Sequence, residues 1–175
     1  MLEQNRAMLG NLMGLYQNDQ AGLAAKREAE KAAQAQFSVS FEKLKHEIIW
    51  PVIVDIGNEL SNYKHDFHVS EEKEFVDSIA AFHPANMTLN IFPSRMRDEF
   101  KKPDSAPYIS FIANNYAKKV GIMVSTMMPG EGGSIGSHGE YDPNEITKEF
   151  VENEIINILK NTLFIHSEIE EANGK

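Results

Sequence analysis

The sequence predicts an α+β fold, a two-layer sandwich in which N- and C-terminal helices flank an antiparallel meander of three to four strands. Residues 86–94, 106–113 and 118–128 alternate apolar and polar side chains, and this period of two is typical of half-buried strands. Before and after this stretch, apolar residues recur every three or four positions, which indicates helices that bury one face. Residues 20–36 consist almost entirely of good helix formers, which predicts a helical arm in front of the sandwich.

Composition excludes several classes of protein. A chain of 175 residues has room for one ordinary domain, or for one domain plus an arm. The net charge of −9 argues against a nucleic-acid partner, because phosphate binding requires clustered Lys and Arg. No apolar run of about 20 residues occurs, so we expect no membrane partner and a cytoplasmic protein. The chain has no cysteine, which excludes disulfides and thiolate chemistry, and no motif indicates a cofactor.

The predicted arm covers residues 1–36, and the predicted α+β domain covers residues 37–175. Leu9, Leu12 and Tyr16 follow coiled-coil spacing in the most apolar part of the arm. Charged residues interrupt the same stripe nearer to the domain, namely Asp19, Lys26 and Glu30. We therefore predict that the arm pairs with a second copy or clasps a partner. The alternative is a helix that packs loosely on its own domain or extends into solvent.

The region between the arm and the three strands contains one further helix. Residues 37–64 show a buried helical face, and Ser40 is placed to cap its start. Pro51 interrupts it, because proline removes a hydrogen bond and clashes with the preceding turn, so the helix either kinks there or starts there. Residues 65–71 alternate in polarity and predict a short edge strand, whereas residues 71–82 fit a helix, a strand or a loop.

The last helix has a clear starting signal. Asp142 is a good N-cap, Pro143 suits the first helical position, and Glu145 is placed for a capping box. A stripe of apolar residues follows at helical spacing, so we expect the helix to run to about Phe164.

The two faces of the predicted sheet differ in their expected environment. The helices should cover the face formed by Met87, Leu89, Ile91, Ile109, Phe111, Val120, Ile122 and Val124. The second face is also apolar, and its exposed members would be Phe92, Tyr108, Ile112, Met123 and Met127. Because large apolar patches are uncommon on monomers, we predict that the arm, a second subunit or a partner peptide covers this face.

Basic residues concentrate in two turns of the sheet. They are Arg95, Arg97, Lys101, Lys102, Lys118 and Lys119. One interpretation is a contact for an anion or an acidic peptide. The other is a solvated loop whose lysines discourage strand aggregation.

The Gly-rich loop 130–139 invites a phosphate-binding interpretation, which its details do not support. It lacks the Gly-Lys-Ser/Thr ending of a P-loop, and its charges are acidic. The sequence therefore predicts a flexible connection. His138 and Glu140 are candidates for acid–base work, although no nucleophile is evident nearby. His65 and His68 lack a third metal ligand, so we predict no metal site.

These observations favour a non-catalytic interaction domain, chaperone- or adaptor-like, that forms a homodimer through its arm and its apolar sheet face. A protein or peptide partner is also compatible with these surfaces. The alternative is a small-molecule-binding or enzymatic domain that uses the Gly-rich loop with His138 and Glu140.

Overall fold

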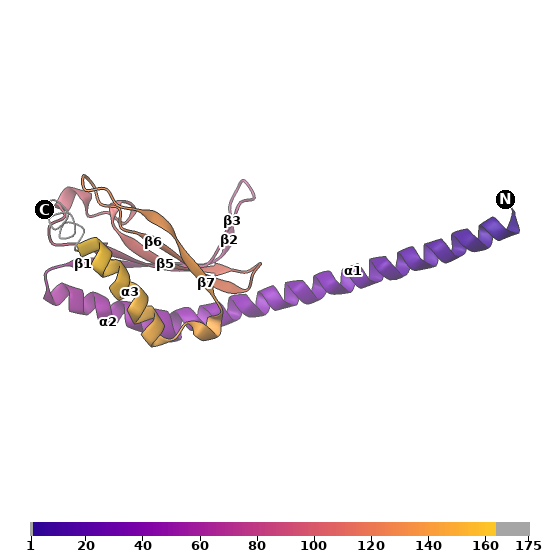
Figure 1. The fold of residues 1–175 in the computed structure, drawn as a ribbon, viewed down its shortest axis with the longest axis horizontal. Helices are drawn as coiled ribbons and strands as arrows, with labels where there is room; N and C mark the ends of the chain where they lie inside the picture. The colour runs from indigo at the N-terminus through magenta and orange to yellow at the C-terminus, as the bar shows by residue number, and fades with distance from the viewer. Residues whose placement is uncertain (1, 164–175) are drawn as a thin grey trace, which may run out of the picture.

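The computed structural model describes residues 2–163 and has the predicted α+β architecture, with helices packed on one side of an antiparallel sheet (Figure 1). The helical elements are α1 (Glu3–Leu44), the π-helical turn η1 (Lys45–Ile49), α2 (Trp50–Asn62), the 3-10 turns η2 (Asp98–Phe100), η3 (Pro103–Ser105) and η4 (Pro143–Glu145), and α3 (Lys148–Leu163). The strands are β1 (Asp66–Glu72), β2 (Phe75–Val76), β3 (Phe82–His83), β4 (Asn86–Phe92), β5 (Tyr108–Asn114), β6 (Lys119–Ser125) and β7 (Ile135–Tyr141).

The first helix runs without a break from the arm into the domain. Ser40 lies inside α1, so the predicted helix start at this residue is wrong. After α1, the turn η1 leads directly into α2, and the Trp50 N–H donates to the carbonyl oxygen of Lys45, five residues back. This wider turn stands immediately before Pro51. Because proline has no N–H to donate and its ring needs room, the π turn allows the helix to pass Pro51 without ending.

The main sheet has five strands in the order β1-β4-β5-β6-β7, and every neighbouring pair is antiparallel. The three strands that alternate in the sequence correspond to β4, β5 and β6, and the predicted edge strand corresponds to β1. Strand β7 is a correction, because it occupies much of the stretch interpreted as a flexible loop. Its glycines and polar residues show no apolar alternation, and it is a strand because it pairs along β6.

The hydrophobic core lies between the sheet and the helices, as predicted. The expected core residues of β4, β5 and β6 are all at most 1% exposed, apart from Val124, which is partly buried; they are Met87, Leu89, Ile91, Ile109, Phe111, Val120 and Ile122. Phe41 of α1, Ile53 of α2 and Ile155 of α3 fill the opposite side of this core. The part of α1 from Phe37 onward is therefore packed into the folded domain.

The last helix begins later than its signal predicts. The capping box between Asp142 and Glu145 is present, but it closes the 3-10 turn η4. The α-helix α3 starts at Lys148, where the hydroxyl of Thr147 accepts the N–H of Phe150 at 3.1 Å. The expected helix end near Phe164 and the remainder of the predicted domain lie outside the described residues.

Residues 71–82, which the sequence left open, complete β1 and enter a small β2–β3 hairpin. The Asp77 carboxylate accepts the N–H groups of Ile79 and Ala81 at 3.0 and 2.9 Å, and it lies 3.0 Å from Nε2 of His83. The hydrogen bond to His83 is the main reason that the pKa of Asp77 is lowered. The Phe75 and His83 rings stack at 4.4 Å between centroids. These contacts stabilise a hairpin whose strands have only two residues each.

Candidate functional site

The most distinctive surface is the tip of α1, which projects away from the rest of the molecule (Figure 1). Every residue from 2 to 32 is exposed except Gly14, which is intermediate. The predicted contact residues Leu9, Leu12 and Tyr16 are 47%, 59% and 59% exposed. Tyr16 precedes Phe37, the first buried residue of the core, by a helix length of about 32 Å. The structure therefore presents the apolar tip well away from its own domain.

Three sets of polar contacts fix the direction of the arm relative to the domain. They involve residues 30–45, which we call the root of the arm. The Lys118 ammonium donates to Oε1 of Glu30 at 2.7 Å, and this hydrogen bond is the main cause of the lowered pKa of Glu30. Closer to the core, Nδ2 of Asn115 donates to Oγ of Ser38 at 3.0 Å and to Oε2 of Glu74 at 2.6 Å. The third set surrounds Lys45. Because these contacts come from different elements, they resist bending of the arm at its base.

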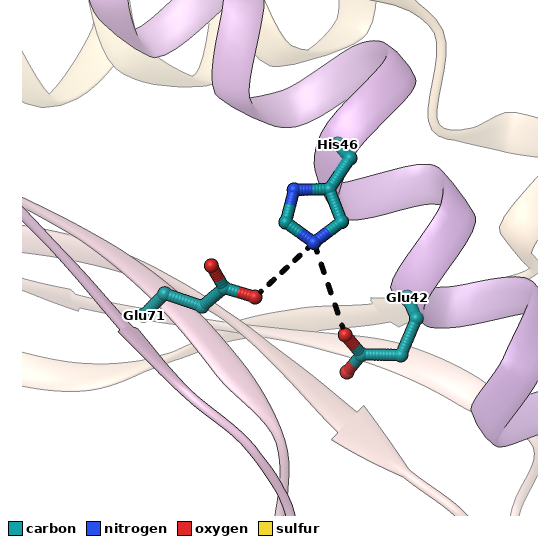
Figure 2. A group of neighbouring side chains, drawn as sticks. All are labelled: Glu42, His46 and Glu71. Carbon is teal, nitrogen blue, oxygen red and sulfur yellow. Dashed lines mark ion pairs between the residues drawn. The ribbon is translucent and has the colours of Figure 1, made fainter.

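Lys45 is the most unusual residue of this root, since its side chain is completely buried at the junction of α1 and η1. Its ammonium lies 2.9 Å from Oε1 of Glu42 and 2.8 Å from Oε1 of Glu71 on β1. His46 approaches the same carboxylates, with Nε2 at 4.0 Å from Glu42 and at 3.4 Å from Glu71 (Figure 2). The hydrogen bond from Lys45 is the largest cause of the lowered pKa of Glu71.

Glu42, His46 and Glu71 place one potential metal-ligand atom each within 4.8 Å of one another, and sequence reasoning missed this group. The Lys45 ammonium already contacts one oxygen of each carboxylate, so a bound cation would meet a like charge beside the same carboxylates. The repulsion from this ammonium argues against a cation, and the contacts form an ion-pair network that fastens the end of α1 to β1. Of the histidines considered from the sequence, His65 accepts the N–H of Ser94 through Nδ1 at 3.0 Å, and His68 lies on β1.

The chain itself covers part of the second face of the sheet. Phe92 is buried in a small cluster with Met96, Phe100, Ala106 and Met128, all contributed by the loops that follow β4 and β6. The middle of this face is polar, where Thr88 donates to Ser110 at 2.7 Å and Asn90 donates to the carbonyl oxygen of Pro103 at 2.9 Å. Tyr108 is half-buried, and this burial raises the pKa of its hydroxyl.

The remaining apolar members of the second face lie in two separate places. Ile112 and Met123 line a groove of about 410 Å³ together with Phe82 of the β2–β3 hairpin and Tyr116 of the β5–β6 turn. Met127 is 44% exposed and lies beside a different hollow near η3. Ile112 and Met123 therefore line one groove, Met127 lines another hollow, and Phe92 is buried in the loop cluster. The exposed hairpin side chains were not part of the predicted surface.

Most of the six predicted basic residues have acidic partners. Arg95 binds Glu131 at 3.1 Å, Lys101 binds Asp66 and Asp98, Lys118 binds Glu30, and Arg97 lies 3.6 Å from Glu99. Within residues 2–163, no ion pair of 4.0 Å or less involves Lys102 or Lys119. Four of the six charges thus have acidic neighbours within the same chain.

His138 occupies a bulge in β7 that sequence reasoning did not detect. Ile122 pairs with Gly139 and Met123 pairs with Ser137, which leaves His138 as the extra residue between them. A bulge changes the direction of the extra side chain. Nδ1 of His138 lies 2.6 Å from Oε2 of Glu154 on α3. The predicted neighbour Glu140 instead accepts a hydrogen bond from Asn114 at 2.7 Å.

His138 and Glu154 line a cleft of about 640 Å³ between β7 and α3, together with Thr126 and Ser134. The loop beside this cleft is held tightly, in contrast to the predicted flexible connection. The Ser134 N–H donates to Oγ1 of Thr126 at 3.0 Å. Gly133 has a φ of +135°, and a Cβ at this position would lie 2.5 Å from the Thr126 carbonyl oxygen. Only glycine fits such a close approach.

None of the helices in residues 2–163 combines the length and the apolar character that a membrane crossing requires. No protein-family model, curated protein or solved structure matches this chain.

Proposed function

We propose that this chain is a non-catalytic interaction protein that self-associates through its helical arm. The observation that supports this proposal is the apolar tip of α1, where Leu9, Leu12 and Tyr16 are exposed about 32–42 Å along the helix from Phe37, the first core residue. A helix that carries an apolar stripe gains stability when it buries that stripe against another surface. The fixed root of the arm keeps the stripe away from its own domain, so the surface that buries it belongs to another molecule.

The expected affinity is moderate. Burial of Leu9 and Leu12 in each of two copies contributes about 6–12 kcal/mol, at about 1.5–3 kcal/mol for each leucine. Association itself costs about 4–15 kcal/mol in lost freedom of motion. At the favourable end of both ranges the surplus is about 8 kcal/mol, which corresponds to a dimer with a dissociation constant in the micromolar range. The groove lined by Phe82, Ile112 and Met123 offers a second apolar contact for a protein or peptide partner.

Light scattering after size-exclusion chromatography tests this proposal over roughly 1–200 µM, a range that covers micromolar dissociation constants. The wild-type mass should rise towards that of a dimer with concentration. The variant Leu9→Glu, Leu12→Glu should remain a monomer. Its matched control is Asn11→Glu, Asn18→Glu, which adds the same charge on the opposite side of the same helix and should dimerise like the wild type. A wild type that stays monomeric at about 200 µM, or equal weakening of dimerisation by both variants, would count against self-association through the arm.

A second candidate function is a small-molecule site in the cleft between β7 and α3. Its support is the pair formed by His138 and Glu154, because a carboxylate on Nδ1 orients the imidazole and leaves Nε2 for proton transfer. The hydroxyls of Thr126 and Ser134 line the same cleft and suit a small polar ligand.

A fragment screen by NMR tests this second candidate. Polar fragments that bind should shift the resonances of His138 and Ser134 in the wild type, and the shift at Ser134 should disappear in His138→Phe. Glu140→Gln is the control, since Glu140 contacts Asn114 rather than His138. Fragments that bind only elsewhere, or equally well to His138→Phe, would remove this candidate.

A further inference from the structure

We infer that the arms of two copies pair in opposite directions, tip over tip, so that Leu9 of one copy lies opposite the partner's Leu12. This inference rests on the proposed self-association, and it adds the geometry of the pair. In an antiparallel coiled coil an a position faces a d position of the other helix, and Leu9 and Leu12 occupy these two positions. Both leucines are exposed, and they lie in the part of α1 that contacts nothing else in the described chain.

Charges along the stripe distinguish the two possible directions. In a parallel, in-register pair each residue meets its own copy, so Asp19 and Lys26 would each face an identical charge in the seam, whereas Glu30 is already paired with Lys118 of its own domain. In the antiparallel pair the apolar tips overlap, and Lys26 and Glu30 lie beyond the partner's apolar tip. Asp19 then lies at the end of the overlap, one turn from the partner's Arg6. Opposite charges replace like charges, so this direction avoids the repulsion of the parallel one.

The charge of the domain favours the same direction. Residues 37–163 contain 12 Lys and Arg against 19 Asp and Glu, a formal charge of −7, whereas residues 2–36 contain four of each and are neutral. A parallel pair would hold two domains of charge −7 side by side at the roots of arms that lie about 8–10 Å apart. The antiparallel pair separates the two Phe37 residues by about 80 Å along the helices. This distance is about ten times the Debye length at physiological salt, so the domains no longer repel each other.

An antiparallel pair also gives a role to the polar segment of α1 between Tyr16 and Phe37. Between Tyr16 and Phe37 the helix contains mostly Ala and charged residues, and Lys31 binds Glu28 at 3.1 Å across one turn. Such a segment is a good helix without being an interface. It acts as a spacer that carries each apolar tip past its own domain to the tip of the other copy.

Distance measurements between spin labels test the direction, and the absence of cysteine allows one label per chain without other changes. Ala25→Cys and Asn11→Cys are suitable sites, because both residues are exposed and lie away from the stripe of Leu9, Leu12 and Tyr16. In the antiparallel dimer the two labels at position 25 should lie about 50 Å apart and those at position 11 about 25 Å apart. In a parallel dimer both positions should give about 25 Å.

The outcomes distinguish the antiparallel direction of the arms from self-association itself. A long distance at position 25 with a short one at position 11 supports the antiparallel pair. Short distances at both positions would overturn the direction and leave self-association standing. A dimer by light scattering with long distances at both positions would place the contact outside the arm, and it would overturn both. A monomer in light scattering, with no measurable distance, would also overturn both.

Discussion

Removal of both carboxylates around Lys45 should destabilise the protein far more than removal of Lys45 itself. The Lys45 side chain is fully buried, whereas the side chains of Glu42 and Glu71 are 37% and 26% exposed. In the variant Glu42→Gln, Glu71→Gln the ammonium stays in the core without an opposite charge, which costs about 3–5 kcal/mol in comparable buried pairs. In Lys45→Met both carboxylates keep access to water and a side chain of similar volume fills the space. We therefore expect a loss of at most about 1.5 kcal/mol.

Thermal and urea unfolding, followed by circular dichroism, measure this difference. One kcal/mol shifts the melting temperature of a domain of this size by about 2–4 °C, so the double glutamine variant should melt roughly 6–20 °C below the wild type. Lys45→Met should stay within about 6 °C of the wild type by the same conversion. If Lys45→Met is as destabilised as the double variant, the lysine contributes more than charge neutralisation and the reasoning fails.

The contact between Lys45 and Glu71 also predicts that the stability of the protein depends on pH. The pKa of Glu71 is lowered in the folded protein, chiefly by the hydrogen bond from Lys45. Such a carboxyl contributes stability that is fully present above its unfolded-state pKa of about 4.3 and is lost as the pH falls through the folded value. The wild type should therefore lose stability below about pH 4.3, and Lys45→Met should lose less over the same range. Parallel acid curves for the two proteins would contradict this assignment.

The remaining predictions concern two glycines and the hairpin. Gly57→Ala should lower the free energy of unfolding in urea by about 1–3 kcal/mol, because a Cβ there would lie 2.4 Å from the Phe67 ring. Gly22→Ala should instead increase helix content in circular dichroism, since nothing lies within 4 Å of its Cβ and alanine favours helix by about 1 kcal/mol; equal gains from both changes would refute this packing. Asp77→Asn should shift the NMR resonances of the hairpin towards unstructured values, and the wild type should show the same change as the pH falls below about 3.9, because His83 lowers the pKa of Asp77. If the hairpin spectrum stays constant down to about pH 2.5, well below the unfolded-state pKa of about 3.9, the Asp77 carboxylate does not stabilise the hairpin.

The alternating strands and the helical arm could be predicted because each carries its own signal. In β4, β5 and β6 the side chains that face the core are apolar at every second position, so this face appears in the sequence as a period of two. The capping box of Asp142 and Glu145 could be predicted for the same reason, since its partners are three residues apart. The predicted helix start at Ser40 is wrong because a residue suited to capping does not interrupt a helix that has already formed.

Only the tertiary structure decided which distant residues meet. Strand β7 has no apolar alternation, and it is a strand because β6 provides its hydrogen bonds. His138 contacts Glu154 on α3 rather than its sequence neighbour Glu140, because the β-bulge changes the direction of the His138 side chain. Lys45 is surrounded by carboxylates that lie 3 and 26 residues away, and no local pattern marks the second of them. The sequence by itself determined which segments are helix and strand wherever burial repeats along the chain. Contacts between segments depend on the path of the whole backbone, and for that reason no single stretch of sequence contains them.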